Sequence, residues 1–472
     1  MPQTADSGRP TALVIGASAT GLFAASVLAE FADVVVVERD RLPDGPESRK
    51  GVPQARHAHL VWSGGVQAFD ELLPGFTDSV VEQGGRLVRI MGDMVSRAPN
   101  EVWFRRFEGG RHRNLVCSRD LLDHVLRERV LRDPRITLHE DSTVECLEGG
   151  PGRVTGIRVR TGTGARTLHA ALVIDASGRG SRAPAWLEAL GLPRVAERRV
   201  DAGVAYATRS YRAPAAAADG FPLVNVQANP ARTPGQGGII LPVEDGRWIV
   251  TLCGTRGGEP AKDPSAFAGF ALGLGDPVIG RLLEAAEPLG EVVTSRSTAN
   301  QRRYYEKMKH WPDGFAVLGD AIAGYNPVYG HGLTVAAQCA LALRGVLRSA
   351  GLTASGTARR IQRAAARPVS GAWDLAVGQD AFYPGATDTP PKAVEKFLAR
   401  FVDRAVETGA RSPRALGALL DVISLERPAT RLFSRDMLVP MFLGPKKPHI
   451  QGPPLTHDER KVIAGAASGP VR

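Results

Sequence analysis

The stretch ALVIGASATG, residues 12–21, joins a short apolar run to a turn rich in small residues. A second apolar run, Val34–Val37, follows a helical interval over 22–31, so this text predicts strand, turn, helix and parallel strand. Gly16 allows the turn to bend tightly, and Gly21 allows the helix to lie close to the strand. The free N–H groups at such a helix start attract a phosphate. The stretch therefore predicts a nucleotide-binding α/β unit.

Two residues of this unit bear on which nucleotide it would hold. Ser18 stands where a dinucleotide-binding turn usually has its second glycine, and its small side chain still lets the backbone approach a pyrophosphate. Glu38 follows the second strand directly. A carboxylate there can bond both hydroxyls of an adenosine ribose and disfavours a 2′-phosphate, so NADP is not expected in this turn. A plain small-residue turn between strand and helix is the alternative.

Two further apolar runs end in an aspartate. Leu172–Asp175 leads into Gly178, and the run over 315–318 leads into Gly319 and Asp320. Carboxylates at the carboxyl ends of parallel strands lie at the edge where open α/β sheets bind ligands. Both aspartates are therefore candidate ligand-binding residues, and an ordinary aspartate turn is the alternative for Asp175.

The loop after Asp320 contains Pro327, which stiffens it, and then Gly330-His331-Gly332. A helix is expected to begin near Leu333, and its free N–H groups could face a group that becomes anionic. A reduced flavin carries its negative charge at N1 and C2=O, so this placement has a chemical purpose. A purely structural loop is the alternative.

Composition bounds the class of protein. Hydrophobic residues make up 43% and charged residues 23% of the 472 positions, which is typical of a soluble globular chain. The N-terminal text does not read as a signal peptide, and no apolar run is long enough to span a membrane. The cysteines have no C-x-x-C spacing, so we expect reduced thiols and a cytoplasmic protein; they are Cys117, Cys146, Cys253 and Cys339.

Several kinds of chemistry find no support. The net charge of +10 is spread along the chain without clusters of basic and aromatic residues, so nucleic acid is not an expected partner. A solvated basic surface explains this charge, and attraction of an anionic ligand or an acidic carrier protein is the alternative. His57 and His59 lack a nearby third ligand, so no metal site is expected, and His57 is instead assigned near the cofactor. Neither a G-x-S-x-G elbow nor a P-loop is present.

Three motifs occur together in a known order: Gly16–Gly21, Asp175–Gly178 and Gly319–Gly332. In this combination the chain resembles FAD-dependent monooxygenases of the para-hydroxybenzoate hydroxylase type. Within that group, residues 53–59 (PQARHAH), 303–306 (RYYE) and 326–332 (NPVYGHG) are similar to the flavin epoxidases of polyether ionophore biosynthesis, the lasalocid and monensin type.

The sequence pattern and this resemblance predict an α/β fold with a discontinuous, Rossmann-like FAD-binding domain. That domain is assigned to residues 10–85, 111–185 and 299–350. An inserted antiparallel β-sheet substrate domain is assigned to 86–110 and 186–298, and a C-terminal helical region to 351–472.

The resemblance also implies which residues bind FAD. The residues assigned to the cofactor are Gly16, Ala17, Ser18, Ala19, Thr20, Gly21, Glu38, Arg39, His57, Arg119, Asp175, Gly178, Gly319, Asp320, Pro327, Gly330, His331, Gly332 and Leu333. Among them Arg119 and Asp320 are assigned to the pyrophosphate or ribityl region, and residues 330–333 to the isoalloxazine.

The implied reaction is oxygen transfer from a flavin C4a-hydroperoxide to alkenes of a large lipophilic polyene polyketide, which gives epoxides. O2 would be the co-substrate, and NADPH or NADH would reduce the FAD directly or through a separate flavin reductase. The substrate would be free or bound to a carrier protein. This chemistry demands no single protein acid or base, so none is assigned.

Two alternatives stay open. One is another flavin reaction, either aromatic hydroxylation or reduction of isoprenoid double bonds; halogenation is disfavoured because no W-x-W-x-I-P text occurs. The other is a non-catalytic flavin-binding protein that recruits a partner.

Overall fold

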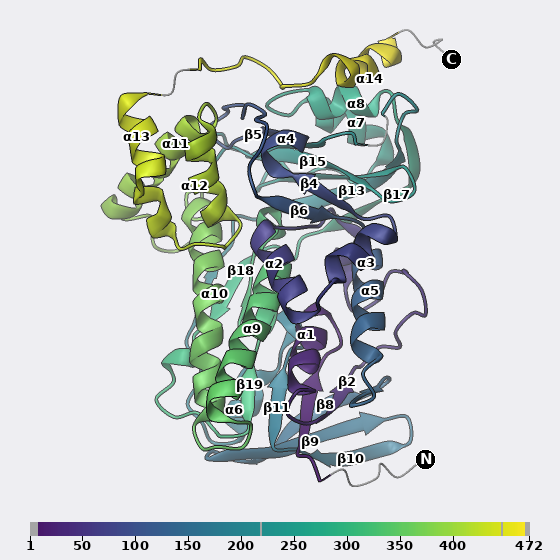
Figure 1. The fold of residues 1–472 in the computed structure, drawn as a ribbon, viewed down its shortest axis with the longest axis vertical. Coiled ribbons are helices and arrows are strands. Elements are labelled where there is room, and N and C mark those ends of the chain that lie inside the picture. Colours follow the sequence, from purple (N-terminus) through teal and green to yellow (C-terminus); the bar gives the residue numbers. More distant parts are fainter. Residues whose placement is uncertain (1–7, 218–219, 445–446, 468–472) are drawn as a thin grey trace.

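A computed structural model of the chain describes residues 8–217, 220–444 and 447–467 (Figure 1). The prediction of no signal peptide concerns in part residues 1–7, and the predicted C-terminal region extends to 468–472; these positions lie outside the described residues. The predicted α/β class is confirmed: one parallel sheet, several antiparallel pairings and a group of C-terminal helices make up the molecule.

A five-stranded parallel sheet forms the core of the lower half in Figure 1. Its order is β19-β11-β1-β2-β7, and the strands are β1 (Thr11–Ile15), β2 (Asp33–Val37), β7 (Ile136–His139), β11 (Leu172–Asp175) and β19 (Phe315–Val317). The apolar runs are continuous because the sheet is covered on both faces, which leaves Val14 and Val36 with no exposed surface. The strand pair predicted at the N-terminus is confirmed.

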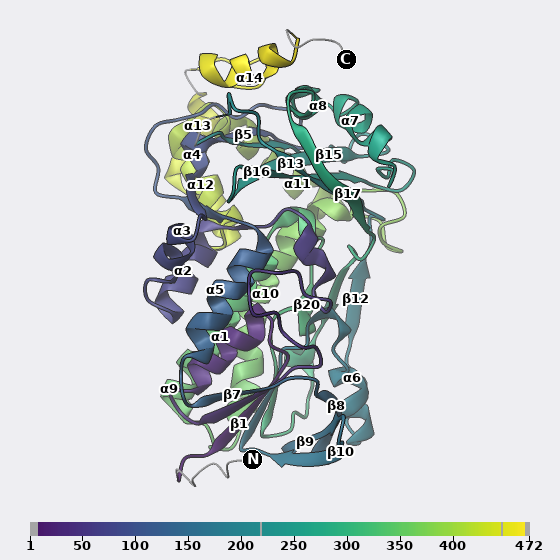
Figure 2. The same ribbon diagram turned by 90° about the vertical axis from the view of Figure 1, so that its right-hand side faces the viewer.

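Helices cover one face of this sheet and three antiparallel strands cover the other (Figure 2). The helices are α1 (Ala19–Leu28), α5 (Arg119–Leu131), α9 (Gly332–Ala350) and α10 (Thr357–Asp380), and the strands are β8 (Thr143–Gly150), β9 (Arg153–Thr161) and β10 (Gly164–His169). Helix α9 begins within one residue of the predicted Leu333. Helix α1 begins at Ala19 rather than at the expected Leu22, because Ser18 already adopts the extended conformation of a residue that precedes a helix.

The upper half is built on a six-stranded sheet of order β17-β13-β16-β15-β14-β5. Its strands are β5 (Met94–Arg97), β13 (Ala205–Arg212), β14 (Leu223–Val226), β15 (Gln236–Val243), β16 (Arg247–Gly254) and β17 (Glu287–Ser295). The predicted antiparallel pairing holds for five strands, but β5 runs parallel to β14. This exception arises because β5 enters from a separate, earlier segment rather than through a hairpin.

Both faces of the upper sheet are buried. Along β15, Ile240 points to the side covered by α7 (Pro264–Leu272) and α8 (Val278–Leu283), whereas Leu241 points to the opposite side, against α12 (Pro413–Ile423). This alternation is the period of two expected of a strand. The upper sheet is therefore fixed between two helical layers.

Short elements connect the two halves. One small sheet has the order β3-β6-β4 and another β12-β18-β20. Their strands are β3 (Leu60–Val61), β4 (Arg86–Arg89), β6 (Arg113–Val116), β12 (Glu197–Val200), β18 (Asn300–Arg303) and β20 (Ala323–Gly324), and the nearby helices are α2 (Ser63–Leu72), α3 (Phe76–Glu82), α4 (Ile90–Asp93) and α6 (Ala183–Ala189). The limits of the predicted domains stay a prediction.

The C-terminal part contains α11 (Ala393–Gly409), α12, α13 (Arg435–Leu443) and α14 (His457–Ala467). The apolar run at the end of α13 is only partly buried: Met437 and Met441 are buried, but Phe442 and Leu443 are 80% and 82% exposed. Helix α13 therefore packs Met437 and Met441 toward the protein interior, while Phe442 and Leu443 at its C-terminal end face solvent. Within the described ranges, none of the helices has the length and apolar character needed to cross a membrane.

Candidate functional site

The turn between β1 and α1 needs glycine at two positions. Gly16 has φ +98°, and a Cβ there would lie 2.9 Å from the carbonyl oxygen of Ala176. At Gly21 a Cβ would lie 1.8 Å from the carbonyl oxygen of Gly16. Ser18, the residue that precedes α1, makes no capping hydrogen bond with its side chain. The backbone of the turn can therefore approach a ligand closely, and the N–H groups of the first helical turn are directed toward it.

Arg119, the first residue of α5, is brought to this turn. Its Nη2 donates to Ser18 Oγ at 3.3 Å, and its Nε donates to Asp123 Oδ1 at 2.7 Å. Helix α5 begins here because Ser118 Oγ accepts from Leu121 N at 3.1 Å, which caps the first helical turn. The Arg119 guanidinium and the start of α1 therefore lie at the same turn, and both groups attract an anion.

Glu38 holds the turn from the end of β2. Its Oε2 accepts from Ala17 N at 2.8 Å and from Arg49 Nη2 at 3.0 Å, and its Oε1 accepts from Asp40 N at 3.1 Å. Arg49 also donates to the Ala17 carbonyl at 2.8 Å. A carboxylate offers about four acceptor sites, so one remains on Oε1 for a hydroxyl. Arg49 was not anticipated, since it lies in a polar loop without any periodic signal.

The second motif serves its own turn. Asp175 has no exposed surface; its Oδ1 accepts from Ser177 N and Ser177 Oγ at 2.9 and 2.6 Å, and its Oδ2 accepts from Ser181 Oγ at 2.6 Å. Burial raises the pKa of this carboxyl, and the hydrogen bonds from Ser177 and Ser181 oppose the rise. Gly178 follows with φ +75°. The structure therefore matches the aspartate-turn alternative and does not direct Asp175 toward the first turn.

Arg39 also points away from the turn. Its side chain is 66% exposed and pairs only loosely with Asp40, with 3.9 Å between Nε and Oδ1.

The third motif returns to the start of α1. A Cβ on Gly319, which has φ +60°, would lie 2.4 Å from Thr20 Oγ1, so this turn touches the first one directly. Among the described residues Asp320 takes part in no hydrogen bond or ion pair, although burial raises its pKa while Arg179 and Arg119 lower it. A Cβ on Gly332 would lie 3.7 Å from Asp320 Oδ1. The Asp320 carboxyl thus stands between the starts of α1 and α9.

The loop before α9 is tightly held. Gly330 has φ +67°, and Trp62 Nε1 donates to the Tyr329 carbonyl at 2.9 Å. His331 is buried; its Nε2 lies 3.0 Å from the Ile423 carbonyl, whereas its Nδ1 is buried without a partner among the described residues. Burial lowers the pKa of His331 to about 4, so the ring is neutral at pH 7. Pro327 is exposed, and Leu333 is buried behind the loop.

A pocket opens beside this loop, between the upper sheet and the end of α10. Its lining residues are Val204, Asn225, Gln227, Ala228, Gly235, Cys253, Gly254, Thr255, Asn326, Val328, Tyr329, Gln379, Asp380 and Tyr383. Asp380 is the only Asp or Glu among these, and none is Lys, Arg or His; burial raises the pKa of its carboxyl, and hydrogen bonds from Tyr329, Asn326 and Asn300 lower it. Burial raises the pKa of the Cys253 thiol to about 12, so it stays protonated at pH 7.

Asp380 is a functional candidate that sequence reasoning missed. Its Oδ2 accepts from Asn300 Nδ2 at 2.7 Å and Asn326 Nδ2 at 2.9 Å, and its Oδ1 accepts from Tyr329 Oη at 2.6 Å. Tyr206 Oη donates to Asn326 Oδ1 at 2.6 Å. These five residues come from four separate segments, so no local spacing could have revealed the network.

The residues behind the epoxidase resemblance fall into two groups. His57 bonds Thr208 Oγ1 at 2.7 Å through Nδ1 and faces the upper sheet close to Tyr206, and burial lowers its pKa to about 4. In contrast, Arg303 donates to the Ala321 carbonyl at 3.1 Å and Tyr305 is buried. The 303–306 segment therefore contacts the chain just after the Gly319-Asp320 turn, whereas Asn326, Val328 and Tyr329 line the pocket.

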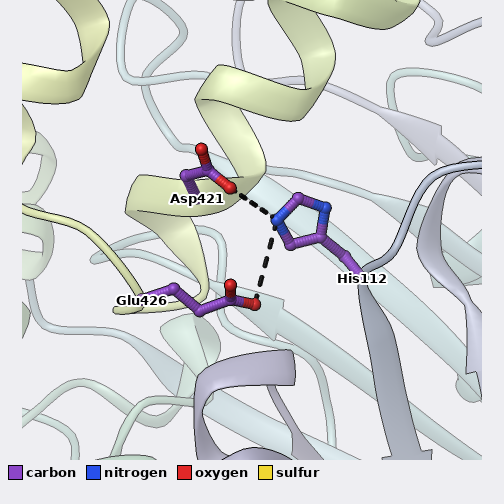
Figure 3. Close-up of side chains that lie close together, drawn as sticks. All are labelled: His112, Asp421 and Glu426. Atoms are coloured by element: carbon purple, nitrogen blue, oxygen red, sulfur yellow. Dashed lines mark hydrogen bonds and ion pairs between the residues drawn. The ribbon is translucent and has the colours of Figure 1, made fainter.

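A separate charged cluster joins β6 to α12 (Figure 3). His112 Nε2 lies 2.9 Å from Asp421 Oδ1 and 3.8 Å from Glu426 Oε1. Arg111 pairs with both carboxylates, and Arg431 Nε lies 2.7 Å from Asp421 Oδ2. Although the three side chains could hold a metal ion by proximity alone, two arginines already neutralise the two carboxylates. The cluster is an ion-pair network that fastens the C-terminal helices to the sheet.

Comparison with known proteins places the chain among flavoproteins. The sequence profile of a family described as "FAD binding domain" matches residues 9–367. Protein Rv3254 of Mycobacterium tuberculosis is 32% identical over 426 residues, which cover 83% of this chain and 89% of that protein.

Solved structures share the fold at low identity. The flavin-dependent brominase Bmp2, as a triple mutant, superimposes with a TM-score of 0.64 at 12% identity over 91% of this chain and 98% of its own. The p-nitrophenol 4-monooxygenase PnpA of Pseudomonas putida superimposes with a TM-score of 0.59 at 15% sequence identity. The match covers 90% of this chain and 98% of that protein. The Diels-Alderase PyrE3 of pyrroindomycin biosynthesis superimposes with a TM-score of 0.57 at 14% sequence identity. The match covers 88% of this chain and 80% of that protein.

Proposed function

Because the chain belongs to the FAD binding domain family, we propose that it is a FAD-dependent monooxygenase that epoxidises alkenes of a large, lipophilic polyene polyketide. The first and third motifs meet at the start of α1, which supports a single cofactor site, and the described residues that line the neighbouring pocket include no basic side chain. That absence of a cation is the observation that favours an uncharged alkene as substrate.

The residues present fit FAD. Two glycines keep the β1–α1 turn open to a pyrophosphate, and Arg119 stands at the uncapped start of α1. Asp320 has a carboxyl without a partner among the described residues, as a site for ribityl hydroxyls requires, and His331 has an orphaned Nδ1. We assign Ser18 and Arg119 to the pyrophosphate, Glu38 to the adenosine ribose and residues 330–333 to the isoalloxazine.

When bound and reduced, FAD reacts with oxygen and supplies the oxygen atom that is transferred. The protein contributes position and charge. The start of α9, where the preceding residue His331 makes no side-chain cap, would stabilise negative charge on a bound ring system. Neutral His57 and His331 add no positive charge beside the pocket at pH 7. Thr208 and Thr251 bond each other at 2.6 Å, which satisfies their hydroxyls on the wall behind His57.

The pocket argues against the aromatic-hydroxylase alternative. A phenolate or an aromatic acid needs a cation or several donors to replace its water, and a buried carboxylate such as Asp380 repels it. Apolar groups from Val204, Val328 and Tyr383 suit a hydrocarbon chain instead. NADPH or NADH is the proposed reductant, directly or through a reductase, with O2 as co-substrate. The four free cysteines agree with a cytoplasmic site of action.

The visible spectrum of the purified or FAD-reconstituted protein tests the cofactor. Incubation with NADPH, ¹⁸O2 and a polyene or a phenol then tests the reaction, with products analysed by mass spectrometry. We expect flavin bands and one labelled oxygen in an epoxide of the polyene. Labelled hydroxyphenol would support the aromatic hydroxylase, and a saturated polyene without label would support the reductase. Flavin bands without any turnover would favour the non-catalytic alternative.

A further inference from the structure

The wall of the pocket holds one unfilled acceptor. Asp380 accepts hydrogen bonds from Asn300, Asn326 and Tyr329. An aspartate carboxylate has about four acceptor sites, so three protein donors leave one, on Oδ1. Asp380 ends α10 and lines the pocket directly, which makes that site reachable by a ligand.

Two amides are available on the sheet side of the same pocket. Asn225 lies in β14 and Gln227 follows it, and both are half-buried. In the part of the chain that the structure describes, neither side chain makes a hydrogen bond. Half-buried amides that face a pocket can bond a ligand oxygen at little desolvation cost. The pocket thus has polar groups on two walls and apolar ones between them.

We propose that this pocket binds the oxygen-bearing end of an uncharged substrate, whose hydroxyl donates to Asp380 while Asn225 and Gln227 bond a neighbouring oxygen. The substrate class is a hydroxylated alkene chain rather than a carboxylate. This assignment rests on the proposed function, because it describes how the same site selects its substrate.

The charge pattern makes the selection two-sided. A hydroxyl completes the hydrogen bonding of Asp380, and a bond to a charged acceptor is stronger than one to a neutral group. A ligand carboxylate would meet Asp380 as a like charge, and the described residues of the wall include no lysine, arginine or histidine to offset the repulsion. Asp380 also holds Asn326 and Tyr329, so a bound hydroxyl lies beside the loop assigned to the cofactor.

The test uses the FAD-loaded protein and three matched probes: an eight-carbon terminal alkenol, its methyl ether and the corresponding alkenoate. Isothermal titration calorimetry measures binding of each probe. For the wild type we expect the alkenol to bind at least about tenfold more tightly than the ether, which lacks the donor, and the alkenoate not to bind. In Asp380→Asn the affinity for the alkenol is expected to fall about tenfold, and binding of the alkenoate is expected to become measurable.

Equal affinity of the wild type for alkenol and ether would overturn the proposal. So would an Asp380→Asn variant that weakens all three probes alike, since that pattern indicates loop support only. Asn225→Leu with Gln227→Met, which leaves the loop network intact, is expected to weaken the alkenol and the ether together by about tenfold. Gln67→Met, on the exposed side of α2, is the matched control and should change nothing.

Absorption of the same samples separates the two levels of the argument. A protein that cannot hold FAD contradicts the proposed function. A FAD-loaded protein with the wrong order of probe affinities contradicts only the assignment of Asp380, Asn225 and Gln227.

Discussion

Arg119 Nη2 donates to Ser18 Oγ across 3.3 Å, which joins the start of α5 to the start of α1. The serine that replaces the usual second glycine is therefore bonded to a cation at the proposed pyrophosphate position.

Replacing Arg119 should weaken cofactor binding. In Arg119→Met the charge is lost while the apolar stem remains, so the Kd for FAD is expected to rise about tenfold to hundredfold, as for other hydrogen bonds to charged groups. Quenching of flavin fluorescence measures it. Arg132→Met, at the exposed far end of α5, is the control. An unchanged Kd in Arg119→Met would place the pyrophosphate elsewhere.

A methyl group at Gly21 should not be tolerated. Its Cβ would lie 1.8 Å from the Gly16 carbonyl oxygen, so Gly21→Ala must displace α1 from the turn. We expect a loss of about 3 kcal/mol in the free energy of unfolding and no FAD binding. Gly345→Ala, within α9 and with nothing within 4 Å, should instead stabilise by up to about 1 kcal/mol. Urea unfolding followed by circular dichroism compares the two, and similar stabilities would contradict the close approach.

Acid should destabilise the fold through buried histidine. The pKa of His331 is lowered from 6.5 to about 4 by burial, so its neutral form contributes stability that is full above pH 6.5 and is lost as the pH falls toward 4. Between pH 7 and pH 5 this amounts to about 2 kcal/mol. His331→Gln should flatten that part of the pH profile of urea unfolding, whereas exposed His310→Gln should not. Identical profiles for wild type and His331→Gln would show that His331 is not a source of the acid lability.

The charged cluster at α12 should depend on its ion pairs and not on a metal. Asp421→Asn leaves Arg431 and Arg111 without one shared carboxylate charge, and because both arginines are partly exposed and screened by solvent, the loss is expected to cost about 1–2 kcal/mol. The melting temperature should fall clearly. Asp458→Asn, on an exposed pair with Lys461, should leave it unchanged. EDTA should have no effect on the wild type; a drop in melting temperature on chelation would assign a metal to His112, Asp421 and Glu426.

Local patterns in the sequence were sufficient for the nucleotide-binding half. The runs 12–15, 34–37 and 172–175 are strands of one parallel sheet, and α9 begins within one residue of the expected position. These features depend on periodicity, glycine sterics and capping, all of which act over a few residues. The prediction for the upper sheet missed the parallel pairing of β5 with β14, because pairing between distant strands leaves no local signal.

For the site, the sequence by itself determined the pieces: the glycine turn, Arg119, Asp320 and the loop to Leu333. Tertiary structure alone decided how they are used. It turned the carboxyl of Asp175 into its own loop, directed Arg39 to solvent, and brought Asp380 from the end of α10 to Asn300 and Tyr329. The reason is physical. Glycine and capping requirements depend on a few neighbouring residues, whereas the hydrogen-bond donors of a buried carboxylate come from distant segments that only the packed chain brings together.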